Sequence, residues 1–183
     1  FPAAPRKLAR RISTGVPGLD DILGGGLTAE RVYLIEGTPG TGKTTLGMQF
    51  LLDGAAKGEA GLYITLSETA DELMAVADSH GWSLDKLAIF ELASDEALAP
   101  DTQQSILHPA EIELGETARG VMEQVDKIKP ARVVFDSLSE MRLLAQKRLR
   151  YRRQILEIQQ FFESRACTVL MLANKTSQSD QHL

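Results

Sequence analysis

The chain has 183 residues, which is enough for one domain with a buried core, and its 43% hydrophobic and 25% charged residues are typical of a folded domain. A formal net charge of -5 provides no general attraction for nucleic acid or an anionic membrane, and no apolar run is long enough to span a bilayer. The single cysteine, Cys167, excludes a scaffold of internal disulfides and is expected to be a small buried residue. We therefore expect a cytoplasmic protein.

The first segment, residues 1–11, contains proline and several basic residues but has no apolar periodicity. We expect a basic N-terminal arm there, followed by one domain at residues 12–183. A short helix is predicted near residues 19–23. The glycines at 24–26 should end it, because glycine permits the positive φ angles of a sharp reversal into the next strand.

From residue 32 onwards, apolar runs alternate with segments of helical periodicity. Expected strands cover residues 32–36, 62–66, 87–92, 132–136 and 168–173, and expected helices cover 43–57, 69–80, 111–129, 140–144 and 151–164. This alternation indicates an α/β fold with a mostly parallel twisted sheet and helices on both faces. We expect the strand at 32–36 to be buried and the polar stretch at 93–109 to form a long surface loop.

A glycine-rich stretch joins the first of these strands to the helix at 43–57. Its pattern is Gly, four residues, then Gly-Lys-Thr at positions 37–44. This spacing is typical of a phosphate-binding loop, in which backbone N–H groups and a helix N-terminus surround phosphate oxygens. Lys43 is expected to reach the β and γ phosphates, and Thr44 to bind Mg²⁺. An ordinary glycine-rich turn is the alternative, but the strand-loop-helix context favours a nucleoside triphosphate as ligand.

A phosphate loop also needs a carboxylate that holds the water shell of the metal. Asp136 ends the apolar run Val133-Val134-Phe135, which places it at the tip of a strand, as this role requires. The alternative is a helix cap, because many buried strands end in Asp for that reason. The neighbouring phosphate loop favours the metal.

Hydrolysis requires a group that orients or deprotonates the attacking water, and Glu68 follows the strand at 62–66. The carboxyl ends of parallel strands meet on the ligand side of a sheet, so Glu68 is well placed as a general base. A first-turn glutamate that stabilises the N-terminus of the next helix fits the position equally well.

A basic run contains Lys147, Arg148, Arg150, Arg152 and Arg153. A solvated helix face is the usual meaning of such a run, and the alternatives are an arginine presented to the triphosphate of a neighbouring subunit or a nucleic-acid contact. The three histidines, His80, His108 and His182, lack the spacing of a zinc site.

The chain resembles the RecA superfamily and, within it, the KaiC-like ATPases, named after the cyanobacterial clock protein. The resemblance covers about residues 11–173. It depends on Ser-Thr-Gly-Val-Pro-Gly-Leu-Asp at 13–20 with the glycines at 24–26, on the phosphate loop, on Ser67-Glu68-Thr69, on Ser79-His80-Gly81-Trp82, and on Val134-Phe135-Asp136-Ser137.

The resemblance implies a RecA-like P-loop NTPase core that binds ATP and Mg²⁺ at subunit interfaces, often in a ring hexamer. It implies slow ATP hydrolysis and, in some members, autophosphorylation on Ser and Thr. Thr44 and Asp136 would serve the metal, Lys43 and Glu68 catalysis, and Ser79 would lie near the nucleotide base. The implied ATP-binding residues of the loop are Thr38, Pro39, Gly40, Thr41, Gly42, Lys43, Thr44 and Thr45.

The chain departs from the family at two places. The clock proteins have two adjacent glutamates after the second strand, the first being the general base, and here the first is Ser67. Either Glu68 does the work or hydrolysis is impaired. The resemblance also implies further strands after residue 173, so we expect the family's domain to continue beyond Leu183, with nucleotide contacts across the subunit interface in that part.

Three functions follow as hypotheses. The first is a slow ATPase whose nucleotide state controls the conformation of an oligomer and its signalling to a partner protein. The second is a nucleotide-gated scaffold with little turnover, which Ser67 favours, and the third is an ATP-dependent Ser/Thr autokinase. The acidic composition argues against a nucleic-acid partner and DNA strand exchange.

Overall fold

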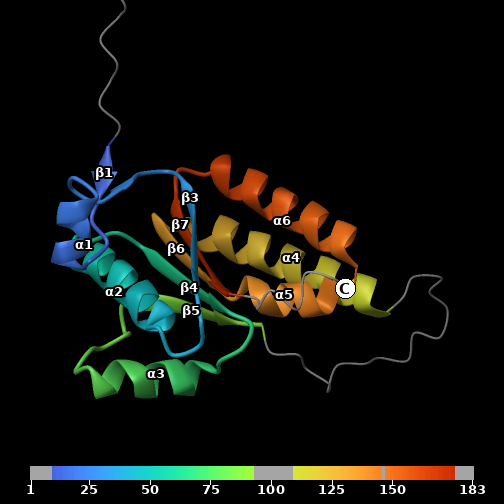
Figure 1. Ribbon diagram of the computed structural model, residues 1–183, viewed down its shortest axis with the longest axis horizontal. Coiled ribbons are helices and arrows are strands. Elements are labelled where there is room, and N and C mark those ends of the chain that lie inside the picture. The colour runs from blue at the N-terminus through green and yellow to red at the C-terminus, as the bar shows by residue number, and fades with distance from the viewer. Residues whose placement is uncertain (1–9, 93–108, 146, 176–183) are drawn as a thin grey trace, which may run out of the picture.

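The computed structural model describes residues 10–92, 109–145 and 147–175 and has a parallel sheet at its centre (Figure 1). Its strand order is β3-β7-β6-β4-β5, and every neighbouring pair is parallel. The strands are β3 (Val32–Gly37), β4 (Gly61–Thr65), β5 (Leu87–Glu91), β6 (Arg132–Asp136) and β7 (Thr168–Asn174). All five predicted strands and the α/β class are confirmed.

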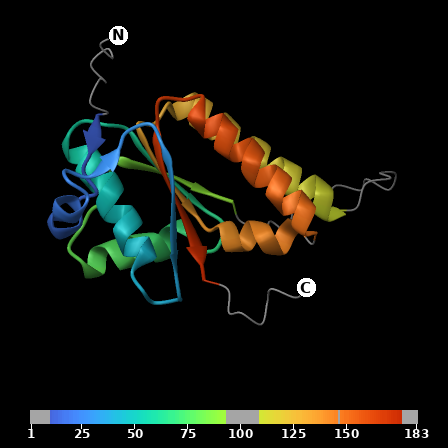
Figure 2. The ribbon, with the colours of Figure 1, turned by 45° about the horizontal axis from the view of Figure 1, so that its top comes forward.

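Helices cover both faces of the sheet, as Figures 1 and 2 show. Two of them, α2 (Lys43–Ala56) and α3 (Ala70–Ser79), lie on one face. On the other face lie α4 (Pro109–Ile128), α5 (Leu138–Ala145) and α6 (Arg148–Glu163). Helix α6 begins three residues earlier than predicted, because arginine is a good helix former and the basic run continues the helix.

The segment before β3 forms a small unit of its own. A short helix, α1 (Pro17–Ile22), is followed by three glycines that all have positive φ, as predicted. The strands β1 (Arg11–Ile12) and β2 (Leu27–Thr28) flank this unit and pair antiparallel, which the sequence did not predict. The remainder of the predicted N-terminal arm and nearly all of the loop predicted at 93–109 lie outside the described residues.

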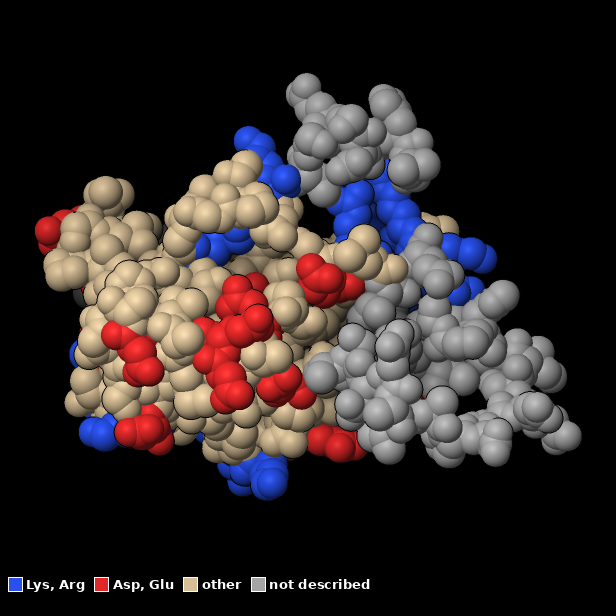
Figure 3. Space-filling model, turned by 90° about the horizontal axis from the view of Figure 1, so that it is seen from below, with Lys and Arg blue, Asp and Glu red and all other residues tan. Residues whose placement is uncertain are grey.

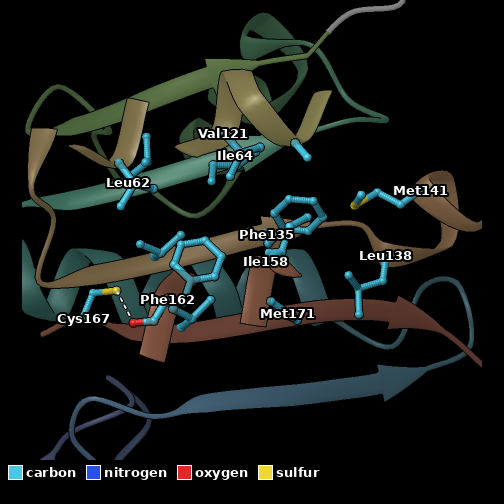
Figure 4. Packing of buried hydrophobic residues seen from close by; sticks show 14 of the residues in the cluster. Leu62, Ile64, Val121, Phe135, Leu138, Met141, Ile158, Phe162, Cys167 and Met171 are labelled. Carbon is cyan, nitrogen blue, oxygen red and sulfur yellow. Dashed lines mark hydrogen bonds between the residues drawn. The ribbon is translucent and has the colours of Figure 1, made fainter. Parts of the chain in front are cut away.

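Alternate residues of the strands enter two hydrophobic cores, one on each face of the sheet. The larger core packs side chains of β4, β6 and β7 against α4, α5 and α6 (Figure 4). Cys167 lies in it, as predicted, with its thiol directed at the Phe162 carbonyl, and burial raises the pKa of the Cys167 thiol to about 11. The second core lies under α2 and α3 and contains Tyr63 and Val134.

The prediction that the strand at 32–36 is buried is wrong for β3 in the described structure. Within the described residues β3 pairs only with β7 and forms an edge of the sheet. Leu34 is 59% exposed there. A strand needs neighbours on both sides and covered faces to be buried, and β3 lacks a second neighbour among the described residues.

The amino end of β6 carries a buried arginine, Arg132, that is 1% exposed. Its guanidinium pairs with Glu59 at 2.6 Å and with Asp53 at 2.9 Å. It also donates to the carbonyls of Phe50 at 2.7 Å and Ser13 at 2.9 Å. Arg132 therefore ties the sheet to α2 and to the segment that precedes β2.

Helix α2 lies close against β6 because it presents glycines there. A Cβ added at Gly47 would lie 3.0 Å from a Val134 methyl group, and one at Gly54 would lie 2.6 Å from Cδ and Nε of Arg132. Contacts of that length require something to shift, so the glycines fix the approach of α2. This approach sets the position of the loop that precedes α2.

Candidate functional site

The loop between β3 and α2 has the backbone conformation that its glycines allow. Gly40 and Gly42 have φ angles of 80° and 84°, which residues with a side chain rarely adopt. Gly42 is the N-cap of α2, and no side chain caps the helix. The first N–H groups of α2 are therefore available to an anion, as a phosphate-binding loop requires.

Lys43 begins α2 and turns back over the loop. Its ammonium donates to the carbonyls of Gly37 and Thr38, both at 3.0 Å, and the Thr41 hydroxyl donates to Thr38 at 2.8 Å. The predicted loop residues from Thr38 to Gly42 are exposed, and those from Lys43 to Thr45 are partly buried. A positive charge thus lies against the loop that would hold the phosphates.

Asp136, at the carboxyl end of β6, meets the start of α2. The Thr44 hydroxyl donates to Oδ2 of Asp136 at 3.2 Å, although the two residues are 92 positions apart in the sequence. A second hydroxyl, that of Tyr63, donates to the same oxygen at 2.7 Å. Asp136 is 7% exposed, and its peptide bond to Ser137 is cis. The structure brings together the two residues that we predicted for the metal.

Glu68 lies three residues beyond Thr65, which pairs with Asp136 in the sheet. The Thr65 hydroxyl accepts from the Glu68 N–H at 3.0 Å and donates to its carbonyl at 2.7 Å, so the backbone of Glu68 is held in place. A hollow of about 190 Å³ lies here, lined by residues 65–69 with Glu91 and Leu92.

The carboxylate of Glu68 does not cap α3. Thr69 is the N-cap and forms a reciprocal capping box with Glu72, and the Ala70 N–H donates to Glu91 at 3.0 Å. Oε2 of Glu68 is buried and has no hydrogen-bond partner among the described residues. Other residues therefore perform the helix-capping role that the sequence left open for Glu68.

The electrostatic surroundings of Glu68 are unfavourable for its charge. Burial raises the pKa of Glu68 above its usual 4.5, and the nearby charges of Asp136 and Glu72 raise it further. A carboxylate with a buried, unpartnered oxygen and a raised pKa is a candidate functional group.

Ser79 is not joined to the loop. It lies at the end of α3, where its hydroxyl donates to the Val76 carbonyl of the same helix at 2.7 Å. Its predicted place near a nucleotide base stays a prediction. The five basic residues lie at the start of α6 or just before it, with the side chain of Arg150 partly buried and the other four exposed.

Acidic side chains gather near the middle of the surface that Figure 3 shows, which is the side on which α3 lies. The exposed acidic residues of α3 are Asp71, Glu72 and Asp78. Such a surface repels a polyanion. No three His, Cys, Asp or Glu side chains of the described residues are grouped to hold a metal ion. No helix in the described part of the chain is long and apolar enough to cross a membrane.

Sequence reasoning missed Tyr63. It stands in the apolar run of β4 and has the pattern of a core residue, so only its hydroxyl distinguished it. A buried tyrosine usually has a hydrogen-bond partner for that hydroxyl, and this was the one available signal.

Known proteins are similar to this chain in sequence and fold. The family model described as "ATPase: KaiC" matches residues 12–183. A UPF0273 protein of Thermotoga maritima is 30% identical over 175 residues, covering 91% of this chain and 70% of that protein. The circadian clock oscillator protein KaiC of Prochlorococcus marinus subsp. pastoris is 35% identical over 135 residues, covering 71% of this chain but 26% of KaiC.

A solved structure is similar as well. The crystal structure of a KaiC-like protein from the hyperthermophilic archaeon Pyrococcus horikoshii OT3 matches with a TM-score of 0.75 and 26% identity. The match covers 92% of this chain and 72% of that chain. The parallel sheet with helices on both faces is therefore the RecA-type fold of KaiC-like proteins.

Proposed function

This chain belongs to the KaiC ATPase family, and on that premise we propose that it binds ATP with Mg²⁺ and hydrolyses it slowly. The nucleotide state would control the conformation of a homo-oligomer, a hexamer by resemblance, and its signalling to a partner protein. The observation that carries hydrolysis is the buried, unpartnered Oε2 of Glu68 at the edge of the sheet that also carries the phosphate loop and Asp136.

The loop fits the phosphates of a nucleotide. The uncapped N–H groups at the start of α2 are hydrogen-bond donors for phosphate oxygens. Lys43 would exchange the carbonyls of Gly37 and Thr38 for these oxygens and neutralise part of their charge. A Cβ at Gly37 would lie 2.6 Å from the Thr41 hydroxyl, so a side chain there would disturb the loop.

The residues at the end of β6 fit a magnesium ion. Mg²⁺ prefers oxygen ligands and keeps several waters, so one hydroxyl and one carboxylate suffice beside the phosphates. Thr44 and Asp136 provide these groups in contact with each other. When bound, Mg²⁺ would withdraw charge from the phosphate oxygens.

Glu68 is the group that would accept the proton of the attacking water. Its carboxylate has an oxygen free to bind the attacking water, and Thr65 fixes its backbone. The water adds to the γ phosphorus, the bond to the β-γ bridging oxygen breaks, and the proton of the water passes to Glu68. Its raised pKa makes it a stronger base than an ordinary glutamate.

The test is phosphate release from ATP and Mg²⁺ by the full-length protein and by three variants. Lys43→Ala and Glu68→Gln should each reduce turnover by about 100-fold or more, and Glu68→Gln should still bind ATP. Glu72→Gln is the matched control, because glutamine also serves in a capping box, and it should retain turnover within about two-fold. Turnover that survives Glu68→Gln would contradict the assignment of Glu68.

The nucleotide-gated scaffold is the second candidate, and Ser67 in place of the first glutamate favours it. Under this hypothesis the protein binds ATP and assembles, yet releases phosphate no faster than Lys43→Ala. Sedimentation with and without ATP and Mg²⁺ measures the assembly. Mass spectrometry of the same reaction tests the autokinase alternative, which requires phosphate on Ser or Thr of the protein itself.

A further inference from the structure

Tyr63 is a buried polar residue that the proposed mechanism has not used. It is 2% exposed and lies in β4, between β5 and β6. In the sheet register it stands opposite Val134, two residues before Asp136, on the face that α2 covers. Residues two apart on a strand share a face, so the ring of Tyr63 can extend along the sheet to Asp136.

The hydroxyl of Tyr63 donates a hydrogen bond to the carboxylate of Asp136. The distance between the Tyr63 hydroxyl and Oδ2 of Asp136 is 2.7 Å, which is the usual length for a hydroxyl that donates to a carboxylate.

The two hydroxyls that contact Asp136 donate to the same carboxylate oxygen. Thr44 and Tyr63 both donate to Oδ2, and the hydrogen bonds of the described residues leave Oδ1 open. Because Tyr63 is fixed in the core, its bond also restricts the rotation of the carboxylate. One oxygen is thus held by the protein, and the other is available to a ligand.

We propose that Tyr63 is a positioning residue for metal-dependent ATP binding: its hydroxyl fixes Oδ2 of Asp136 and so leaves Oδ1 for the water shell of Mg²⁺. This inference rests on the proposed function. Removal of a group that orients a metal-binding carboxylate typically weakens metal affinity by about 10-fold to 100-fold. A purely structural tyrosine would instead affect folding and leave the metal dependence unchanged.

The chain offers a matched control. Tyr33 lies in β3, and its hydroxyl donates to the Thr28 carbonyl at 2.9 Å, remote from the metal residues in the contacts that it makes. Tyr33→Phe and Tyr63→Phe each delete one hydroxyl and one hydrogen bond. Only the second deletion removes a donor to Asp136.

The experiment titrates a fluorescent ATP analogue into the full-length protein and both variants, in EDTA and over a series of Mg²⁺ concentrations, with thermal unfolding measured in parallel. Tyr63→Phe should raise the Mg²⁺ concentration for half-maximal enhancement of binding by about 10-fold, while binding in EDTA changes less than about two-fold. Tyr33→Phe should match the parent in both conditions.

Three results would overturn the inference. Unchanged metal dependence in Tyr63→Phe would show that the hydroxyl does not act through Asp136. Equal weakening with and without Mg²⁺, together with a lowered Tm, would show that Tyr63 only supports the fold. A parent that does not bind the nucleotide at any Mg²⁺ concentration would refute the proposed function itself, and the inference with it.

Discussion

Each end of β6 carries a buried charged residue, but only the one at the amino end is paired with residues of opposite charge. Arg132, at the amino end, is surrounded by two carboxylates and two carbonyls, so its buried charge is fully matched. Asp136, at the carboxyl end, is also buried, but it receives only two neutral hydroxyls and no cation among the described residues. Glu68 beside it has a buried oxygen with no partner at all in this part of the chain.

This difference indicates a structural role for the buried charge at the amino end of β6 and a functional role for the charges at its carboxyl end. A buried charge needs a partner, and the protein supplies one at Arg132, where the result is attachment of α2 and the N-terminal segment to the sheet. The described residues provide no cation for Asp136 and no hydrogen-bond donor for Oε2 of Glu68. Under the proposed function, a cation and a water molecule would bind at this end of the strand.

The largest effect on stability is expected from removing the charge of Arg132 at the amino end of β6. Arg132→Met should lower the free energy of unfolding by about 3 kcal/mol or more, because it leaves Asp53 and Glu59 without their cation. Denaturant unfolding measures the loss. Arg165→Met, which removes an exposed ion pair with Asp126, is the control and should cost at most about 1 kcal/mol. Equal losses in both variants would contradict the comparison.

A smaller effect is expected at Asp53, and it depends on pH. Burial alone would raise the pKa of Asp53, but hydrogen bonds from Lys57 and Ser13 and the charge of Arg132 outweigh it and lower the pKa below the usual 3.8. Because the pKa is lower in the folded state, ionised Asp53 stabilises the fold above that value, and the contribution is lost as the pH falls through the lowered pKa.

Asp53→Asn should therefore be less stable than the parent at pH 7, by roughly 1 kcal/mol for this partly buried group. The difference should disappear well below pH 3.8. Denaturant unfolding across this pH range checks the prediction. A difference that persists at low pH would mean that packing, rather than charge, accounts for it.

The smallest effect on stability is expected at Glu68, near the carboxyl end of β6, where substitution should stabilise the protein. The pKa of Glu68 is higher in the folded state, so its ionised form costs stability at neutral pH, and the cost is absent below its usual pKa of 4.5. Glu68→Gln should therefore raise the Tm at pH 8, by about 1 °C, while it removes turnover.

Scanning calorimetry at pH 8 and below pH 4.5 measures this effect, and at the lower pH the two proteins should have the same Tm. Glu72→Gln, in the capping box of α3, should not raise the Tm at either pH. A lowered Tm in Glu68→Gln at pH 8 would place Glu68 among the residues that support the fold.

Local patterns predicted the loop and the strands because each depends on residues close together in the sequence. The strand Arg132–Asp136 is confirmed to its last residue, and the loop pattern includes its own helix start. Asp136 could be assigned to the metal from its place at a strand end. The contact of Thr44 with Asp136 then followed from parallel strands ending at one edge.

Tyr63 and Arg132 could not be predicted in the same way. The partners of their strongest hydrogen bonds, Asp136 and Glu59, each lie 73 positions away in the sequence. Local pattern shows that such a residue is buried but not which group meets its polar end. The exposure of β3 has a similar cause, since an edge is defined by which strands pair and not by the strand's own residues.

The close approach of Gly54 to Arg132 ties the evolution of two positions together. A side chain at position 54 would occupy the space of the guanidinium stem, since even a Cβ would lie 2.6 Å from it. Chains that keep arginine at position 132 should therefore keep glycine at 54, whereas chains with a short apolar residue at 132 can accept alanine or larger there. Among homologous sequences, positions 54 and 132 should covary although neither belongs to the candidate site.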